Sequence, residues 1–281
     1  MVSHSQARSI NETLREAAGR IQKEDATALM RWVLDVRDTW LFLHGNEPMP
    51  LDAAERFAAA VQTRAAGTPL AYIEGSRGFW SMELEVSPAT LIPRVETELL
   101  VEAALAAVPS EGQVDVLDLG TGSGAIALAI AKERRNAQVV AIDQCAGALE
   151  VAARNASRHA LTNVRFLKGD WYAPVAGQQF HCIVSNPPYI REDDAHLKQG
   201  DLRFEPMGAL ASGEDGLTDI RTLVQGAMRH LMRGGFFAIE HGYDQGEAVR
   251  HCFENAGFVE VRTLKDLESR DRVTQGFKPT H

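Results

Sequence analysis

An apolar run that begins at Phe180 ends in four residues that could bind a planar amino group. Prolines donate no hydrogen bonds within a sheet and keep the preceding residue out of the helical region, so a buried strand is predicted to stop here. The amide of Asn186 is not titratable, so it can position and polarise a nitrogen but cannot act as a general base. A plain turn after a core strand is the alternative. The four residues are Asn186, Pro187, Pro188 and Tyr189.

A glycine loop upstream favours the functional interpretation. It follows an apolar run, Val116 to Leu119, and precedes a helical pattern, so its glycines allow a tight turn and close approach to a ligand. Asp143 ends the next predicted strand, about twenty residues on, where an acid accepts hydrogen bonds from ribose hydroxyls. Together these features predict an adenosine-containing ligand. The loop residues are Gly120, Thr121, Gly122, Ser123 and Gly124.

The glycine spacing favours S-adenosylmethionine as that ligand. Gly-x-Gly-x-Gly departs from the Gly-x-Gly-x-x-Gly fingerprint of pyrophosphate binding, which disfavours a nicotinamide dehydrogenase. Asp170 and Trp171 follow the third predicted strand and are placed to reach the amino group and the ring face of adenine. Trp171 could instead be a partly buried packing residue. All these candidates follow adjacent strands at their carboxyl ends, where open α/β sheets bind ligands.

The elements that position these residues divide the chain into three parts. Residues 1–75 have only helical periodicity, with Asp25 and Asp38 predicted to cap the second and third helices. This part is expected to be a substrate-recognition domain, with a stabilising extension as the alternative. Residues 76–92 alternate from Trp80 onward, which predicts a strand and a β-hairpin linker.

Residues 93–281 form the third part, in which strands and helices alternate. The pattern predicts a Rossmann-like, doubly wound α/β sheet. A polar stretch from Ile190 to Gly213 is interpreted as a substrate-side loop. Strands are predicted at 114–119, 139–142, 164–167, around 183, at 236–239, 259–264 and 272–277, and helices at 96–108, 125–133, 146–159, 219–232 and 246–256.

Composition excludes several classes of protein. A net charge of -9 disfavours broad attraction to nucleic acid or to an anionic membrane. Three widely spaced cysteines predict neither a disulfide framework nor a zinc site, and we expect no metal. No signal peptide or membrane-spanning run is recognisable, so a cytoplasmic location is expected. The Asn-Ala-Ser pattern at Asn155 matches a glycosylation acceptor by chance.

Taken together, the motifs resemble the S-adenosylmethionine-dependent methyltransferases that modify N5 of a glutamine in peptide chain release factors. The resemblance covers nearly the whole chain. One departure is Val95, where that family usually has a proline, and it touches no presumed ligand atom. The segments that carry the resemblance are Leu91–Glu98, Asp118–Gly124, Ser185–Ile190, Phe204–Pro206, Gly213–Gly216, Glu240–Gly242 and Gln245–Gly246.

The resemblance implies methyl transfer to the side-chain amide of the glutamine in a Gly-Gly-Gln motif, with release factors as protein partners. It also implies that the helical domain helps to recognise the release factor. Asn186, through its side-chain oxygen, and Pro187, through its carbonyl, would each accept one N–H of the amide. Pro188 and Tyr189 would wall the pocket and exclude water. No metal or catalytic base is required, because the methylated amide cation loses its proton readily.

Other functions stay open at this stage. A glutamine of a ribosomal protein or an adenine of nucleic acid could be the acceptor, and the negative charge weighs against nucleic acid. The chain could also bind S-adenosylmethionine without catalysis, although its intact Asn-Pro-Pro-Tyr sequence counts against that role.

Overall fold

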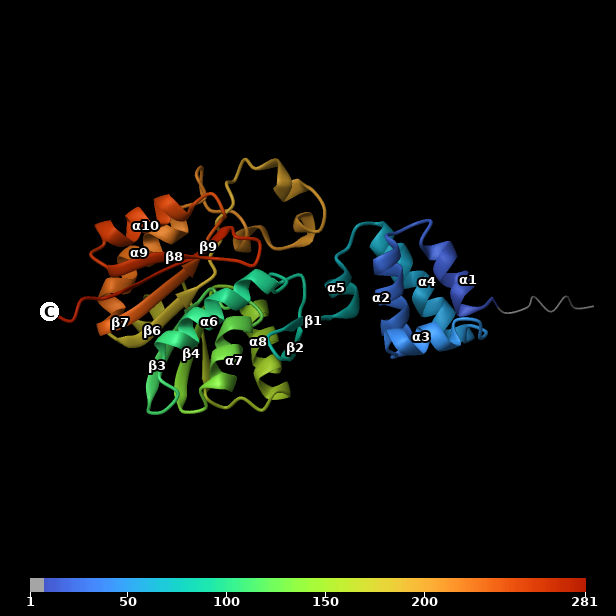
Figure 1. Ribbon diagram of the computed structural model, residues 1–281, viewed down its shortest axis with the longest axis horizontal. Coiled ribbons are helices and arrows are strands. Elements are labelled where there is room, and N and C mark those ends of the chain that lie inside the picture. Colours follow the sequence, from blue (N-terminus) through green and yellow to red (C-terminus); the bar gives the residue numbers. More distant parts are fainter. Residues whose placement is uncertain (1–7) are drawn as a thin grey trace, which may run out of the picture. The chain divides into compact units, whose positions relative to one another are not determined.

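The chain forms two compact units, Met1–Gly75 and Ser76–His281, in a computed structural model that describes residues 8–281 (Figure 1). The first unit is helical. Its apolar side chains, among them Leu29, Met30 and Phe57, pack into a core of their own. Within the described residues the helices are α1 (Ile10–Ala17), α2 (Lys23–Leu34), α3 (Asp38–His44), α4 (Leu51–Ala65) and α5 (Leu70–Glu74).

Two predicted helix caps in this unit are wrong. The residues that precede α2 and α3 are Gln22 and Arg37, and Asp25 lies inside the first turn of α2. There its carboxylate accepts a hydrogen bond of 2.6 Å from Nε of Arg64, which ties α4 to α2. An acid inside the first turn still interacts favourably with the helix dipole, so composition alone does not separate it from a cap.

A β-hairpin begins the second unit. Strands β1 (Ser76–Phe79) and β2 (Met82–Glu85) pair antiparallel, and the hairpin contributes Phe79, Met82 and Leu84 to the core of this unit. Trp80 lies in the turn with φ 54°, not in a strand as predicted, because apolar alternation continued across the turn. The hairpin exit therefore starts from a fixed position on the second unit.

A seven-stranded sheet forms the centre of the second unit. Its order is β5-β4-β3-β6-β7-β9-β8, and the strands from β5 to β7 are parallel, whereas β9 is antiparallel to both neighbours. From β3 the chain adds β4 and β5 on one side of the sheet and then β6 and β7 on the other. The strand order therefore reverses between β3 and β6, which is where such sheets bind ligands. The strands are β3 (Val114–Leu119), β4 (Ala137–Asp143), β5 (Val164–Lys168), β6 (Phe180–Ser185), β7 (Leu231–Glu240), β8 (Val259–Lys265) and β9 (Asp271–Phe277).

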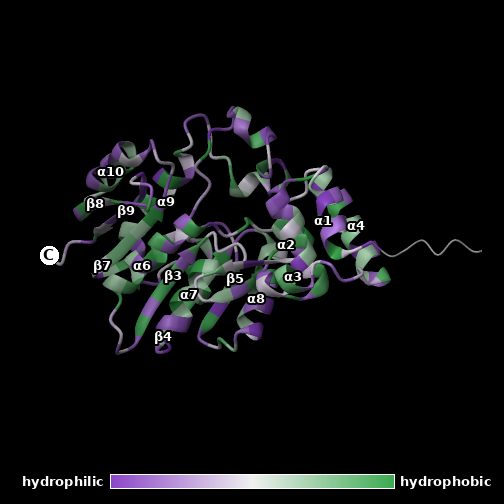
Figure 2. Cartoon of the chain, turned by 45° about the vertical axis from the view of Figure 1, so that its right-hand side comes forward, coloured by the Kyte–Doolittle hydropathy of each residue, from purple (hydrophilic) through white to green (hydrophobic). Residues whose placement is uncertain are grey.

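Helices cover both faces of this sheet, so the predicted doubly wound α/β fold is confirmed (Figure 1). Side chains alternate between the faces: Val116 packs towards α6 (Glu98–Ala107), α7 (Ala125–Glu133) and α8 (Ala146–Arg158). Its neighbour Leu117 packs in the other cluster, with α9 (Thr218–His230) and α10 (Gly246–Asn255). Strands buried on both faces are largely apolar, as the hydrophobic colour of much of β7 shows (Figure 2).

Short 3-10 turns shape the connections near the carboxyl ends of the strands. The polar stretch predicted as a loop contains three of them and is held by a bridge between Ile190 and Ala211. No helix in residues 8–281 is long and apolar enough to cross a membrane. The turns are η1 (Val95–Thr97), η2 (Ala173–Val175), η3 (Ala195–Lys198), η4 (Leu202–Phe204) and η5 (Met207–Ala209).

Candidate active site

A cavity of about 390 Å³ lies at the carboxyl ends of β3, β4, β5 and β6. Its size suits a small-molecule ligand. Three of the predicted site residues, Gly124, Pro187 and Tyr189, are not among the residues that line it. The predicted residues that do line it are Gly120, Thr121, Gly122, Ser123, Asp143, Asp170, Trp171, Asn186 and Pro188.

A buried acid shapes the glycine loop from below. The carboxylate oxygen Oδ2 of Asp118 accepts hydrogen bonds from Oγ1 of Thr121 at 2.7 Å and from the backbone N–H of Ala127 at 3.2 Å. Burial raises the pKa of Asp118 to about 7. Oδ1 is buried without a hydrogen-bond partner in residues 8–281. No role was predicted for Asp118 from the sequence, although an acid inside an apolar strand was the available signal.

Glycine is required where the loop approaches its neighbours. Gly120 has φ +76°, and a Cβ there would lie 3.3 Å from Cζ3 of Trp171, which also lines the cavity. Gly122 has φ +55°, and its backbone N–H donates a hydrogen bond of 2.9 Å to Oδ2 of Asp143. A side chain at either position would be strained and would narrow the space for a ligand.

Asp143 keeps capacity to bind a diol. Its Oδ1 accepts a hydrogen bond of 2.9 Å from the backbone N–H of Cys145, and its Oδ2 accepts the one from Gly122. A carboxylate offers about four acceptor positions, so each oxygen retains a lone pair for a further donor. These remaining acceptor positions fit the two hydroxyls of a ribose bound in the cavity.

Trp171 lies between the cavity and the core of the second unit. Its ring lines the cavity beside Gly120 and also packs against the buried cluster on the α9 face of the sheet. Its φ is +42°, a left-handed conformation that bulky residues rarely adopt. Backbone strain of this kind collects at ligand sites, where the surrounding structure enforces it.

The amide of Asn186 is held by a side chain from a distant segment. Its Nδ2 donates a hydrogen bond of 3.2 Å to Oγ1 of Thr97, which also lines the cavity and is 4% exposed. This contact leaves Oδ1 on the opposite side of the amide as an acceptor. Pro187 is buried, and the hydroxyl of Tyr189 donates to Oε1 of Glu240 at 3.3 Å.

Glu240 is a second buried acid at this edge of the sheet. Burial raises its pKa to about 7, against the opposing effects of Thr97, Arg272 and Tyr189. The same burial, together with the charge of Glu240, raises the pKa of the Tyr189 hydroxyl. Glu240 belongs to the segment Glu240–Gly242, which carries part of the family resemblance, but no role was predicted for its side chain.

A third acid joins two loops that contribute to the cavity wall. Glu205 is buried, and its carboxylate accepts hydrogen bonds from the backbone N–H of Ile92, at 3.0 Å, and from the guanidinium of Arg94. The loop before α6 is thereby connected to the loop after β6. Nothing in the local pattern around Glu205 indicated this contact.

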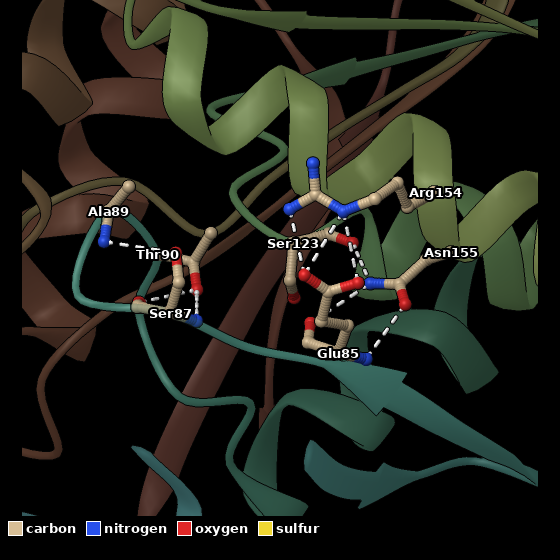
Figure 3. A network of polar contacts seen from close by, with 7 residues as sticks. All are labelled: Glu85, Ser87, Ala89, Thr90, Ser123, Arg154 and Asn155. Carbon is tan, nitrogen blue, oxygen red and sulfur yellow. Dashed lines mark hydrogen bonds and ion pairs between the residues drawn. The ribbon is translucent and has the colours of Figure 1, made fainter. Parts of the chain in front are cut away.

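Asn155 connects the glycine loop to the hairpin exit (Figure 3). Its Nδ2 donates to the carbonyl oxygens of Ser123 at 2.9 Å and of Glu85 at 3.0 Å, and its Oδ1 accepts from the backbone N–H of Glu85 at 2.7 Å. Because this side chain is 0% exposed and fully engaged, it is no glycosylation acceptor. Arg154 beside it forms an exposed ion pair with the carboxylate of Glu85.

The cavity lies where the strand order reverses, between the glycine loop and the Asn-Pro-Pro-Tyr sequence at the end of β6. These features define a Rossmann-like methyltransferase. Residues 95–202 match the family described as "Methyltransferase small domain", and residues 7–75 match the "PrmC N-terminal domain". A crystal structure of a methyltransferase from Pyrococcus furiosus shares the fold, with a TM-score of 0.54 at 21% identity over 79% of this chain and 98% of that one.

The chain belongs to the release factor glutamine methyltransferase family. It is 55% identical to the release factor glutamine methyltransferase of Xylella fastidiosa strain Temecula1, over 95% of this chain and 97% of that protein. The protein of the same name from Escherichia coli strain K12 is 45% identical, over 94% of this chain and 96% of its own length.

Proposed function

We propose that this enzyme transfers a methyl group from S-adenosylmethionine to the side-chain amide nitrogen of the glutamine in a release factor's Gly-Gly-Gln motif. Family membership supports the substrate. The observation that carries the proposal is the oriented amide of Asn186, which stands in the wall of a cavity whose other residues fit an adenosine ligand.

The residues of the cavity fit the cofactor part by part. Asp143 would accept hydrogen bonds from the ribose hydroxyls, Asp170 would accept one from the adenine amino group, and Trp171 would contact the adenine ring. The backbone at Gly120 and Gly122 would lie against the remainder of the ligand. When bound, S-adenosylmethionine supplies a methyl group on a positively charged sulfur.

The chain's own residues would hold and polarise the acceptor amide. Oδ1 of Asn186 and the carbonyl oxygen of Pro187 would each accept one N–H of the glutamine, which increases electron density on a nitrogen whose lone pair is delocalised. The lone pair would thereby be directed at the methyl group that the bound cofactor would supply, with the sulfur keeping the electrons of the S–C bond. The methylated amide cation afterwards releases a proton to water, so no basic side chain is required.

The helical unit would bind the release factor outside the reacting loop. Its matching segment spans residues 7–75, and large apolar side chains on its surface are open to solvent. Phe42 is 87% exposed, Leu43 69% and Leu51 79%. Exposed side chains of this kind are available for a protein partner. A partner that acts in translation termination also implies a cytoplasmic reaction.

The proposal is tested by mass spectrometry of intact release factor after incubation with enzyme and S-adenosylmethionine. A mass increase of one methyl group on the wild-type factor is expected, with none on a factor whose acceptor glutamine is replaced by alanine. Methylation that persists on the alanine control would overturn the acceptor assignment.

A further inference from the structure

A buried carboxyl group, that of Glu240, lies close to Asn186 and takes no part in the mechanism proposed above. Glu240 is 1% exposed at the end of β7, and Oε1 accepts a hydrogen bond from Tyr189. Oε2 is buried and receives no hydrogen bond from residues 8–281. The side chain of Thr97 nevertheless acts on this carboxyl and stabilises its charged form. Thr97 therefore interacts with both Asn186 and Glu240.

Sheet register explains why these groups meet. Strands β6 and β7 run parallel with Ser185 opposite Ile239, so Asn186 and Glu240 each stand one residue past that pair. The 3-10 turn η1 then places Thr97 within hydrogen-bond distance of Asn186, and the side chain of Thr97 also acts to lower the pKa of the Glu240 carboxyl. Three segments that are far apart in the sequence thus converge at the strand end.

The chemistry of a hydroxyl gives this arrangement a direction. Threonine has one O–H donor and two acceptor lone pairs. Because Oγ1 of Thr97 accepts from Nδ2 of Asn186, its proton is free to point to another acceptor. The carboxyl of Glu240, whose Oε2 is buried without a hydrogen-bond partner in the described residues, would be that acceptor.

Direction matters because the two ends of an asparagine amide are nearly equal in shape. A half-turn of the Asn186 side chain would exchange Oδ1 and Nδ2 and would present donors to the N–H groups of the acceptor glutamine. Such an orientation could neither bind the acceptor nitrogen nor stabilise the charge that develops on it.

We propose that Thr97 is a positioning residue for methyl transfer, which selects the productive orientation of the Asn186 amide and is itself oriented by Glu240. This inference rests on the proposed function of the site. It assigns Thr97 an effect on the chemical step that acts only through Asn186. A threonine that merely fills space at this point would have no such dependence.

The test compares Thr97→Val, which keeps the shape and removes the hydroxyl, with Thr97→Ser, which keeps the hydroxyl. Single-turnover methylation of intact release factor, cofactor affinity by calorimetry and thermal unfolding are measured for each. We expect the valine variant to lose at least about tenfold in rate, with cofactor affinity within about threefold, and the serine variant to recover most of the rate. An undiminished rate for Thr97→Val, or equal losses in both variants, would overturn the inference.

A double-mutant comparison separates positioning from packing. In an Asn186→Ala background, Thr97→Val is expected to cause no further loss, because its effect acts through the missing amide. A further loss of the full size would show a structural role and sink the idea. If the valine substitution prevents folding, Glu240→Leu takes its place, because leucine removes both acceptor oxygens. The same loss is expected in the wild-type background and the same absence of effect with Asn186→Ala.

The wild-type enzyme provides the arm that tests the proposed function. Failure of wild type to methylate the release factor would overturn that function and this inference with it. An active wild type with an equally active Thr97→Val variant would overturn the inference alone.

Discussion

The Nδ2 atom of Asn155 lies 2.9 Å from the carbonyl oxygen of Ser123, so a side chain of α8 fixes the glycine loop directly. The same amide pairs with both backbone polar groups of Glu85 (Figure 3). One buried residue therefore sets the distance between the glycine loop and the hairpin exit, both of which lead into the cavity wall. Its substitution should affect stability and cofactor affinity together.

We predict that Asn155→Leu costs about 2 to 4 kcal/mol in unfolding free energy, because it leaves buried backbone groups of Ser123 and Glu85 unsatisfied. Cofactor affinity should fall as the loop loosens. The adjacent Arg154→Ala is the matched control, since its exposed ion pair contributes about 1 kcal/mol or less. Urea unfolding and calorimetry measure both effects, and equal costs for the two variants would contradict the role of Asn155.

Asp143→Ala should weaken binding of S-adenosylmethionine roughly ten- to over a hundredfold. The variant loses charge-assisted hydrogen bonds to the ribose, worth about 1.5 to 3 kcal/mol, and also releases the N–H of Gly122. Calorimetric titration checks this, with Asp115→Ala, a half-exposed acid in β3, as control. Unchanged affinity in the Asp143 variant would refute the ribose assignment.

Asn186→Ala should largely abolish methyl transfer while leaving the fold and much of the cofactor affinity intact. The reason is that its oxygen contributes mainly when positive charge develops on the acceptor nitrogen. Single-turnover kinetics with excess enzyme isolate that step from product release. Near-normal turnover in this variant would show that the mechanism is wrong.

The buried acids predict a pH dependence of stability. Folding raises the pKa of Glu240 from 4.5 to about 7, so the folded state holds its proton more tightly than the unfolded state. The contribution of this group to stability is therefore full below pH 4.5 and is lost as the pH rises towards 7. Asp118, raised from 3.8 to about 7, acts in the same direction.

Glu240→Gln removes one of these titrations and should reduce the pH dependence. Relative to wild type, the variant should be more stable at pH 8 than at pH 5, by an amount on the order of 3 kcal/mol at most. Urea unfolding of both proteins at the two pH values gives this difference. The contributions of all other titrating groups are the same in the variant and the wild type, so they cancel. Parallel curves for the two proteins would contradict the assigned burial cost.

Exchange of exposed apolar residues tests the recognition surface. Phe42→Ser with Leu43→Ser should lower kcat/KM for intact release factor by about tenfold, through KM, because remote contacts hold the substrate. Cofactor affinity should not change. Leu267→Ser, at a fully exposed position of the other unit, is the matched control. Equal kinetics for the variant and the control would remove the helical surface from the proposal.

Local patterns determined much of the second unit. The sequence predicted β3 and α7 with their observed bounds, because an apolar strand, a glycine loop and a helical repeat follow one another without ambiguity. It also placed the glycine loop, Asp143 and Asn186 at neighbouring strand ends, since parallel strands must end at the same edge. The short helix α5 and the turn at Trp80 were missed, because a few residues carry too little periodicity to identify.

Only the tertiary structure determined how the side chain of Asn186 is held. The partner of Asn186 is Thr97, 89 positions away, and the partner of Glu205 is Ile92, 113 positions away. A sequence pattern indicates which face of an element is buried, but a hydrogen bond between loops depends on their positions in space. The sequence therefore determined that an asparagine would stand at the end of β6, whereas the folded chain decided which way its amide faces, because that orientation depends on packing around Thr97 and Glu240.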